Sequence, residues 1–434
     1  MELTEKKYWE SLEWLYSRLP MFSRVGAAAY KPGLEMTETL DAFFRHPHRH
    51  FRSIHIGGTN GKGSTSHMIA SVLQNQGYKT GLYTSPHLTD FRERMRINGK
   101  MIPKDMVCEF VEEWRASKFE GRPSFFELTM MMAFQWFARE KVDFAVIEVG
   151  MGGRLDSTNI INPLLSIITN ISKDHTQFLG ESVEKIAFEK AGIIKKDIPV
   201  VIGEANGKIK DIFLKKATAE GSPIHFAENI ANELSLQYSD KNGWEGKLSN
   251  GSPFAVGLHG TYQKKNIATV IQSLYILRNN GIEISDENIA EGLKRVVSNT
   301  GLRGRWQIVM DQPKVICDTG HNIAGITEIL KTLGCHYPDS NIKFVIGFVN
   351  DKDVAGIVRL FPKDNDYYFC QADIPRAMEA AKVAKHFEDF GIKGRVIPSV
   401  SEAFAEALGK SSSNDVIYIG GSTFVVADFL KSLP

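Results

Sequence analysis

The apolar residues of this chain follow two alternating periods, one typical of strands and the other of helices. Ile54 and Ile56 alternate with polar neighbours, which predicts a short strand over 53–56. From Ser64 onward the apolar residues recur at helical spacing, and this helix is expected to end near Gly77. A strand followed directly by a helix is the repeating unit of α/β proteins.

The same periods predict the other elements of the chain. Helices are expected over 4–19, 36–46, 104–118, 124–140, 182–191, 266–278 and 286–297, strands over 79–85, 144–149, 164–170 and 199–202, and a loop over 22–33. Toward the C-terminus, strands over 314–318, 342–347, 367–370 and 416–419 alternate with helices over 322–333, 353–361, 376–389 and 401–409. This alternation predicts an α/β fold with two domains, the first with a mainly parallel sheet and the second smaller and Rossmann-like. We expect the first domain over 1–297, a linker that serves as a hinge over 298–301, and the second domain over 302–434.

The loop between the first predicted strand and its helix holds four glycines in seven positions around one lysine, Lys62. Glycines let backbone N–H groups turn inward around phosphate oxygens, and the helix N-terminus and the lysine add favourable charge. The usual phosphate-binding pattern is G-x-x-x-x-G-K-[ST]. Here three residues separate Gly57 from Gly61, and Gly63 stands between Lys62 and Ser64. A glycine-rich surface loop is the alternative, but the flanking strand and helix favour a nucleotide phosphate loop.

Polar side chains follow three predicted strands at their carboxyl ends, where ligands bind in α/β sheets. Ser85 is either a metal ligand or the cap of the next helix, and on this residue alone the cap is favoured. Glu148 is a magnesium ligand or the ion-pair partner of a lysine, and the phosphate loop favours the metal. His175 alone would be structural. Together these residues indicate a cluster around one Mg²⁺.

Basic residues in two further places leave their roles open. Arg92, Arg94 and Arg96 alternate before an Asn-Gly turn typical of hairpins. They could grip an anionic substrate or form the solvated face of a strand, and the sequence does not choose. Lys190, in the helix over 182–191, is compatible with the protein surface.

Composition excludes several classes of protein. The 434 residues are 43% hydrophobic and 24% charged, with a formal net charge of +1, so no strong attraction to nucleic acid or membrane is expected. The four cysteines form no C-x-x-C pair, which fits a reducing cytosol and predicts no zinc site. The polar N-terminus predicts no signal peptide, and no apolar run reaches membrane-spanning length.

Several motifs in order along nearly the whole chain resemble those of one family. They are Gly58–Ser64, Tyr83–Leu88, Arg92–Gly99, Phe126–Thr129, Glu148–Asn159, Asp174-His175, Glu189–Ile193, His259–Asn266, Gly304-Arg305, Asp318–Asn322 and Gly421-Ser422. The chain resembles the folylpolyglutamate synthase/dihydrofolate synthase family of the Mur ligase superfamily. Each motif alone is moderately specific, whereas the whole set in family order is very specific.

The resemblance implies roles for individual residues. The implied ATP-binding residues are Gly58, Thr59, Asn60, Gly61, Lys62, Gly63, Ser64, Asn266, Arg305 and Asp318. Ser85, Glu148 and His175 would ligate Mg²⁺, and Lys190 matches a lysine that is carbamylated, which would let it hold a second Mg²⁺. Arg92, His321 and Ser422 would bind the substrate or the incoming glutamate.

The implied activity is an ATP-dependent ligation of L-glutamate to dihydropteroate, to reduced folates or to both, through an acyl phosphate. The implied partners are small molecules only, and the resemblance predicts a cytoplasmic monomer. Two alternatives stay open: a Mur-type ligase that joins an amino acid to a cell-wall precursor, and a P-loop ATPase that acts as a switch. The polar motifs of the second domain argue against a simple switch.

Overall fold

A computed structural model describes residues 2–19, 33–239 and 243–433, so nearly all of the loop expected over 22–33 lies outside the described residues. The chain forms two compact units. Unit 1 comprises Met1–Gln237, Trp244–Gly257 and Lys264–Gly301, and unit 2 comprises Tyr238–Gly243, Leu258–Gln263 and Leu302–Pro434. Two short segments from the range 1–297 therefore fold with the C-terminal residues. The residues expected to link the domains begin within helix α13 (Val296–Thr300), and their role as a hinge stays a prediction.

The sheet of unit 1 has eight strands, six of them parallel. Their order is β4 (Lys100–Met101), β3 (Met95–Ile97), β2 (Thr80–Tyr83), β5 (Phe144–Glu148), β1 (Arg52–Gly57), β6 (Leu165–Ile168), β7 (Val200–Ile202) and β8 (Ile224–Phe226). Strands β3 and β4 pair antiparallel around Asn98-Gly99, which confirms the predicted hairpin. Because β2, β5, β1 and β6 run parallel, their carboxyl ends meet at one edge of the sheet.

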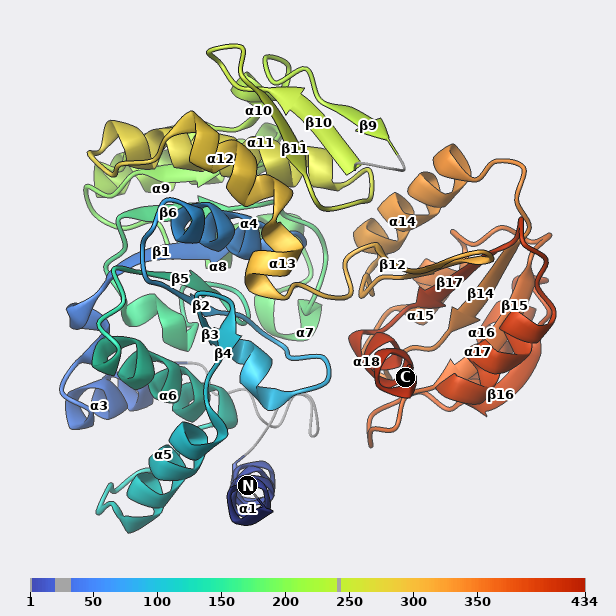
Figure 1. The fold of residues 1–434 in the computed structure, drawn as a ribbon, viewed down its shortest axis with the longest axis horizontal. Helices are drawn as coiled ribbons and strands as arrows, with labels where there is room; N and C mark the ends of the chain where they lie inside the picture. Colours follow the sequence, from blue (N-terminus) through green and yellow to red (C-terminus); the bar gives the residue numbers. More distant parts are fainter. Residues whose placement is uncertain (1, 20–32, 240–242, 434) are drawn as a thin grey trace. The chain divides into compact units, whose positions relative to one another are not determined.

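Helices cover both faces of this sheet (Figure 1). Helices α1 (Glu2–Arg18), α3 (Glu35–Phe43), α5 (Lys104–Ala116) and α6 (Phe125–Arg139) share one apolar core with side chains of β2 and β5. Another core joins α8 (Val183–Ala191) and α9 (Gly207–Glu220) to β6 and β7. Helix α3 stops before the predicted end at 46 because Arg45 and His46 take left-handed φ angles of 59° and 58°.

Helix α4 (Lys62–Asn75) is buried along most of its length, against the sheet and against α12 (Asp286–Lys294). A Cβ on Gly292 would lie 2.6 Å from the Cα of Val72, so only glycine permits this approach. The Ser71 hydroxyl donates to the Gly292 carbonyl at 2.6 Å. Helix α11 (Gln263–Asn279) follows the short segment 258–263 of unit 2.

Short elements complete unit 1, and the sequence pattern did not predict most of them. They are η2 (Pro47–His50), η3 (Phe91–Arg94), η4 (Ser157–Ile160), α7 (Thr176–Leu179), α10 (Glu228–Ala231), β10 (Gly243–Lys247) and β11 (Pro253–Val256), whereas β9 (Gln237–Ser239) has only its first residue in unit 1. Strands β10 and β11 pair antiparallel. Helix α9 and strand β8 were also not predicted. None of the helices in the described ranges has both the length and the apolar character that crossing a membrane requires.

Unit 2 is a second α/β unit, as the alternating pattern predicted. Its strand order is β12 (Gln307–Asp311), β13 (Lys314–Cys317), β17 (Val416–Gly420), β14 (Ile342–Ile346), β15 (Asp366–Gln371) and β16 (Arg395–Ser399). Only β12 is antiparallel. The helices are α14 (Ile323–His336), α15 (Val354–Val358), α16 (Ala380–Glu388), α17 (Val400–Gly409) and α18 (Thr423–Ser432). The sequence pattern missed β12, β16 and α18.

Candidate active site

The glycine-rich loop connects β1 to α4, as the sequence predicted, although α4 begins at Lys62 and not at Ser64. Gly61 precedes the helix with a left-handed φ of 86°. Lys62, Gly63 and Ser64 therefore form the first helical turn. The N–H groups of a first turn have no partner within the helix, so they are suited to bind phosphate oxygens.

Residues that follow β6 hold this loop in place. The Thr59 N–H donates to the Asn170 carbonyl at 2.9 Å, and the Asn60 N–H donates to the Asn170 side chain at 3.0 Å. The Thr169 hydroxyl donates to the Asn60 carbonyl at 2.6 Å. Thr169 and Asn170 were not predicted as functional residues from the sequence. Their position at the end of a strand next to β1 was the available signal.

Two glycines of the loop leave no room for a side chain. A Cβ on Gly58, whose φ is 136°, would lie 1.9 Å from the Thr169 hydroxyl oxygen. A Cβ on Gly61 would lie 2.3 Å from Oδ1 of Asn266 on α11. The structure thus brings Asn266, a predicted ATP-binding residue, against the loop. A loop in which glycines leave the backbone N–H groups uncovered fits a nucleotide phosphate.

The amines of two lysines donate hydrogen bonds to the same carbonyl oxygen of the loop. The Lys190 amine donates to the Gly58 carbonyl at 2.7 Å, and the Lys62 amine donates to the same oxygen at 3.2 Å and to the Thr59 carbonyl at 3.1 Å. Lys190 is only 4% exposed, so the surface position considered from the sequence is wrong. Burial, together with the nearby charge of Lys62, lowers the pKa of Lys190 to about 7.

The carboxyl ends of β2 and β5 bring two predicted metal ligands together. The Ser85 N–H donates to Oε2 of Glu148 at 3.1 Å, and Glu148 is buried. The next helix, η3, is capped by Asp90, so the interpretation of Ser85 as its cap is wrong. Hydroxyl and carboxylate oxygens are ligands that Mg²⁺ accepts. The donor set at this edge therefore fits a divalent cation.

His175, the third predicted metal ligand, precedes α7 in a left-handed conformation, past the end of β6. The backbone N–H of His175 donates to the Asp174 carboxylate at 2.9 Å. Across the described parts of the chain, no three side chains of His, Cys, Asp or Glu gather as a metal site. A site of one serine, one glutamate and one histidine needs only two side chains of those types, and the role of His175 stays a prediction.

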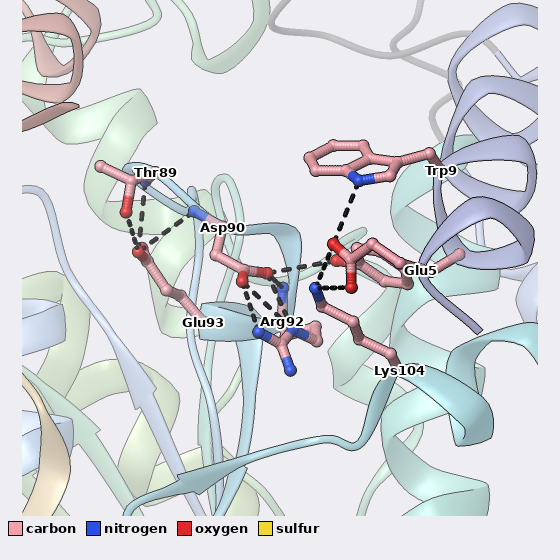
Figure 2. A network of polar contacts seen from close by, with 8 residues as sticks. Glu5, Trp9, Thr89, Asp90, Arg92, Glu93 and Lys104 are labelled. Carbon is pink, nitrogen blue, oxygen red and sulfur yellow. Dashed lines mark hydrogen bonds and ion pairs between the residues drawn. The ribbon is translucent and has the colours of Figure 1, made fainter. Parts of the chain in front are cut away.

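Arg92 lies in a dense polar network on the loop after Ser85 (Figure 2). Its guanidinium donates to both carboxylate oxygens of Asp90, with the shortest distance 2.7 Å. The Tyr8 hydroxyl of α1 donates to the same carboxylate at 3.2 Å. The Glu93 carboxylate accepts the N–H groups of residues 88–90. The ion pair with Asp90 thus fixes the Arg92 side chain, and the role of Arg92 in substrate binding stays a prediction.

The other two arginines of the stripe are buried, so the solvated strand face considered from the sequence is wrong. Arg94 is 5% exposed and Arg96 8%. The Arg94 side chain donates to Nδ1 of His87 at 2.8 Å, and burial lowers its pKa. Arg94 belongs to the turn η3, and only Arg96 lies on a strand.

A buried polar chain runs from β1 to the loop after β5. Nε2 of His55 lies 2.8 Å from the Thr158 hydroxyl, which donates to the Asp156 carboxylate at 2.5 Å. Asp156 also accepts the Met151 N–H at 2.8 Å. Burial lowers the pKa of His55 to about 3 and raises the pKa of Asp156. This role of His55 was not predicted from the sequence, because no local pattern marks a contact between residues so far apart in the chain.

Asp318, His321 and Ser422, which were predicted from the sequence, follow the neighbouring strands β13 and β17, and Arg305 precedes β12. Asp318 follows β13 and is 3% exposed. Nδ1 of His321 lies 2.9 Å from the Thr319 carbonyl, and the Arg305 guanidinium donates to the Thr319 hydroxyl. Ser422 caps α18 and accepts the Phe424 N–H at 3.2 Å. The structure thus brings Asp318, His321 and Arg305 to one loop region of the unit.

Comparison with known proteins assigns the class. Residues 56–274 match the Mur ligase middle domain, and residues 304–423 match the Mur ligase, glutamate ligase domain. Both matches fall on α/β units with a mainly parallel sheet, and the first begins at the phosphate loop. Fold and site therefore define an ATP-dependent ligase of the Mur type.

The particular family follows from the relatives. The chain is 32% identical to the dihydrofolate synthase/folylpolyglutamate synthase of Bacillus subtilis, over 98% of this chain and 99% of that protein. An Escherichia coli FolC in complex with DHPP and ADP is 28% identical, with a TM-score of 0.82 over 98% of this chain and 97% of the other. A Yersinia pestis folylpolyglutamate synthase/dihydrofolate synthase complexed with AMPPNP and Mn is 27% identical, with a TM-score of 0.79 and 97% of both chains covered. The chain belongs to the folylpolyglutamate synthase/dihydrofolate synthase family.

Proposed function

We propose that this protein joins L-glutamate to the carboxylate of dihydropteroate, of a folate or of both, and converts ATP to ADP and phosphate. The observation that carries the proposal is the phosphate loop of unit 1, in which Gly58 and Gly61 leave no room for a side chain and the amines of Lys62 and Lys190 donate to one carbonyl oxygen. The names of the relatives supply the substrate class, since the similar E. coli structure holds DHPP and ADP.

The proposed reaction has two steps. The substrate carboxylate attacks the γ-phosphorus of ATP, and ADP leaves, while the N–H groups of the loop and the ammonium of Lys62 offset the developing charge. The amine of L-glutamate then attacks the acyl carbon. The C–N bond forms, the C–O bond to phosphate breaks, and the amine loses a proton. We propose that Asn266 and Arg305 contact ATP and that Asp318, His321, Ser422 and Arg92 serve nucleotide, glutamate or substrate, as the family resemblance implies.

The metal requirement rests on the donor set at the sheet edge. We propose that Ser85, Glu148 and His175 hold Mg²⁺, which supplies positive charge beside the phosphates. The similarity to a structure with AMPPNP and Mn supports a divalent cation. We also propose that Lys190 is carbamylated and takes part in holding a second Mg²⁺. Its pKa of about 7 leaves a neutral amine available, whose nitrogen can bond to the carbon of CO₂ with loss of a proton.

The remaining expectations from the sequence are proposals of the same kind. They are an ATP-binding domain over 1–297, a glutamate-ligase domain over 302–434 that closes on a hinge at 298–301, and a cytoplasmic monomer without a nucleic-acid or membrane partner. Closure would exclude water, which would otherwise hydrolyse the acyl phosphate.

The test is ATP-dependent phosphate release with L-glutamate and either dihydropteroate or tetrahydrofolate, one at a time. Activity with both substrates identifies a bifunctional enzyme, and activity with one assigns the chain to that branch. Release with neither, while ATP still binds, rejects the proposal in favour of a cell-wall precursor ligase or a switch. If the rate of phosphate release does not depend on glutamate, the P-loop ATPase switch is favoured.

A further inference from the structure

The Asp318 carboxylate is held by three donors, all within unit 2. Oδ2 accepts the Trp306 N–H at 2.7 Å and the hydroxyl of Tyr262. Oδ1 accepts the Gly320 N–H at 2.8 Å. With both oxygens occupied in a buried position, this carboxylate organises the loops around it, because each bond to a buried charge is costly to lose.

Tyr262 is the donor that the ligase chemistry leaves unexplained. It lies in the segment 258–263, which precedes α11 in sequence but folds with unit 2. Its ring is half-buried and packs against the apolar core of that unit. Burial and the adjacent Asp318 carboxylate hold the pKa of Tyr262 well above its usual range, so its hydroxyl remains a donor. The neighbouring Thr261 also contacts unit 2, through the Thr332 hydroxyl at 2.6 Å.

The turn that carries Arg305 depends on the same carboxylate. Gly304 and Trp306 both have left-handed φ angles, 69° and 44°. For a bulky residue such as Trp306 that conformation is unfavourable and needs support from its surroundings. The bond from the Trp306 N–H to Asp318 supplies that support, and the Thr319 N–H donates to the Gly304 carbonyl at 3.1 Å.

We propose that Tyr262 is a positioning residue of the ligase: its hydroxyl fixes the Asp318 carboxylate, which in turn fixes the turn that presents Arg305 to ATP. This inference rests on the proposed function for the role of Arg305. Without the hydroxyl, Oδ2 keeps only the Trp306 N–H as a donor. The Asp318 carboxylate can then rotate, and the turn over residues 304–306 can adopt more than one conformation. Tyr262 itself is not required to touch a substrate.

The experiment compares Tyr262→Phe with wild type and with Tyr367→Phe. Tyr367 is the matched control, because it is a buried tyrosine of unit 2 whose hydroxyl donates to the Pro362 carbonyl, away from Asp318. We expect Tyr262→Phe to raise the KM for ATP about tenfold, the scale of one hydrogen bond to a charged group, with the KM for the folate substrate within about twofold of wild type. Hydrogen exchange of the Trp306 and Gly320 amides should quicken about tenfold in Tyr262→Phe. Tyr367→Phe should change neither quantity.

A double variant with Asp318→Asn completes the test. If Tyr262 acts through Asp318, the two effects overlap and the double variant is no worse than Asp318→Asn alone. Multiplied effects, an unchanged KM for ATP, unchanged amide exchange, or an equal change in Tyr367→Phe would each overturn the inference. A wild type without glutamate-dependent phosphate release rejects the proposed function and this inference with it. An active wild type beside an unaffected Tyr262→Phe rejects the inference alone.

Discussion

Lys190 and Lys62 share one acceptor, the carbonyl oxygen of Gly58, at 2.7 and 3.2 Å. The shared oxygen brings the buried amine of Lys190 close to the half-buried Lys62, whose positive charge disfavours a second one on Lys190. The protonation of Lys190 therefore bears on the stability of the fold as well as on the proposed chemistry.

The folding free energy is expected to depend on pH through Lys190. Between its folded pKa of about 7 and its ordinary value of 10.5, the unfolded chain holds a proton that the folded chain has released. Stability should therefore rise with pH from about 7 toward 10, by at most about 1.4 kcal/mol per unit for this group. Urea unfolding of the uncarbamylated protein, in CO₂-free buffer at pH 7 and 9, should show this slope in wild type and not in Lys190→Met, because a carbamate on Lys190 would not titrate as an amine. The control Lys431→Met, at an exposed position, should keep it, and an unchanged slope in Lys190→Met would contradict the assignment.

His55 predicts a dependence of the same sign, but in acid. Its folded pKa of about 3 lies below the ordinary 6.5, so the unfolded chain gains a proton first as the pH falls. Stability should drop as the pH falls from about 6.5 toward 3, again by up to about 1.4 kcal/mol per unit. Unfolding at pH 7 and 5 should show a smaller drop for His55→Gln than for wild type and for His50→Gln, which changes an exposed histidine. Equal drops in all three proteins would exclude His55 as the cause.

The phosphate loop should not tolerate a side chain at Gly58. Gly58→Ala places a methyl group 1.9 Å from the Thr169 hydroxyl, which must move and release Asn60. We expect the affinity for ADP, measured by calorimetry, to fall about 100-fold. Gly77→Ala is the matched control, since Gly77 also has a left-handed φ of 101° but a Cβ there meets nothing within 4 Å. If both variants bind ADP equally well, the loop is not the nucleotide site.

Glu148 can be tested apart from its structural bond. Glu148→Gln keeps a side-chain oxygen to accept the Ser85 N–H, but it removes the charge that would attract a divalent cation. We expect kcat to fall about 100-fold and the Mg²⁺ concentration needed for half-maximal activity to rise. Glu140→Gln, which removes a partly exposed partner of Lys79, should behave as wild type. A normal Mg²⁺ titration in Glu148→Gln would remove this residue from the metal site.

The sequence predicted those parts of the fold in which a local pattern carries the signal. The strand, glycine loop and helix around Lys62 are local, and so are the strand ends at Ser85 and Glu148. Strand β16 was missed because it is an edge strand, mostly exposed and with a proline, so it carries no buried apolar run. The hydrogen bond from Lys190 to the Gly58 carbonyl joins residues that are distant in sequence, and no periodicity reveals such a contact.

In the segment with Arg92, Arg94 and Arg96, side-chain capping produces a helical turn where the residue pattern was also compatible with a strand. Alternation of the three arginines was compatible with a strand, one of the two interpretations left open, yet residues 91–94 form the turn η3. The Asp90 side chain accepts the Arg92 N–H at 2.9 Å, and the Glu93 side chain accepts the Asp90 N–H at 3.2 Å. This reciprocal capping stabilises a helical turn, because it satisfies N–H groups that a turn leaves unpaired. The sequence Asp90-Phe-Arg-Glu93 held that signal, and the alternation concealed it.

The segment 258–263 also bears on how such ligases can be taken apart and recombined. Unit 2 is continuous in space but not along the gene, because Thr261 and Tyr262 are encoded upstream of α11. A fragment cut at 301/302 would leave Asp318 without its tyrosine and Thr332 without its threonine partner. If the C-terminal part were exchanged between relatives at that boundary, Tyr262 and Asp318 would come from different parent proteins, and so would Thr261 and Thr332. A chimera that carries residues 258–263 together with 302–434 keeps both halves from one parent.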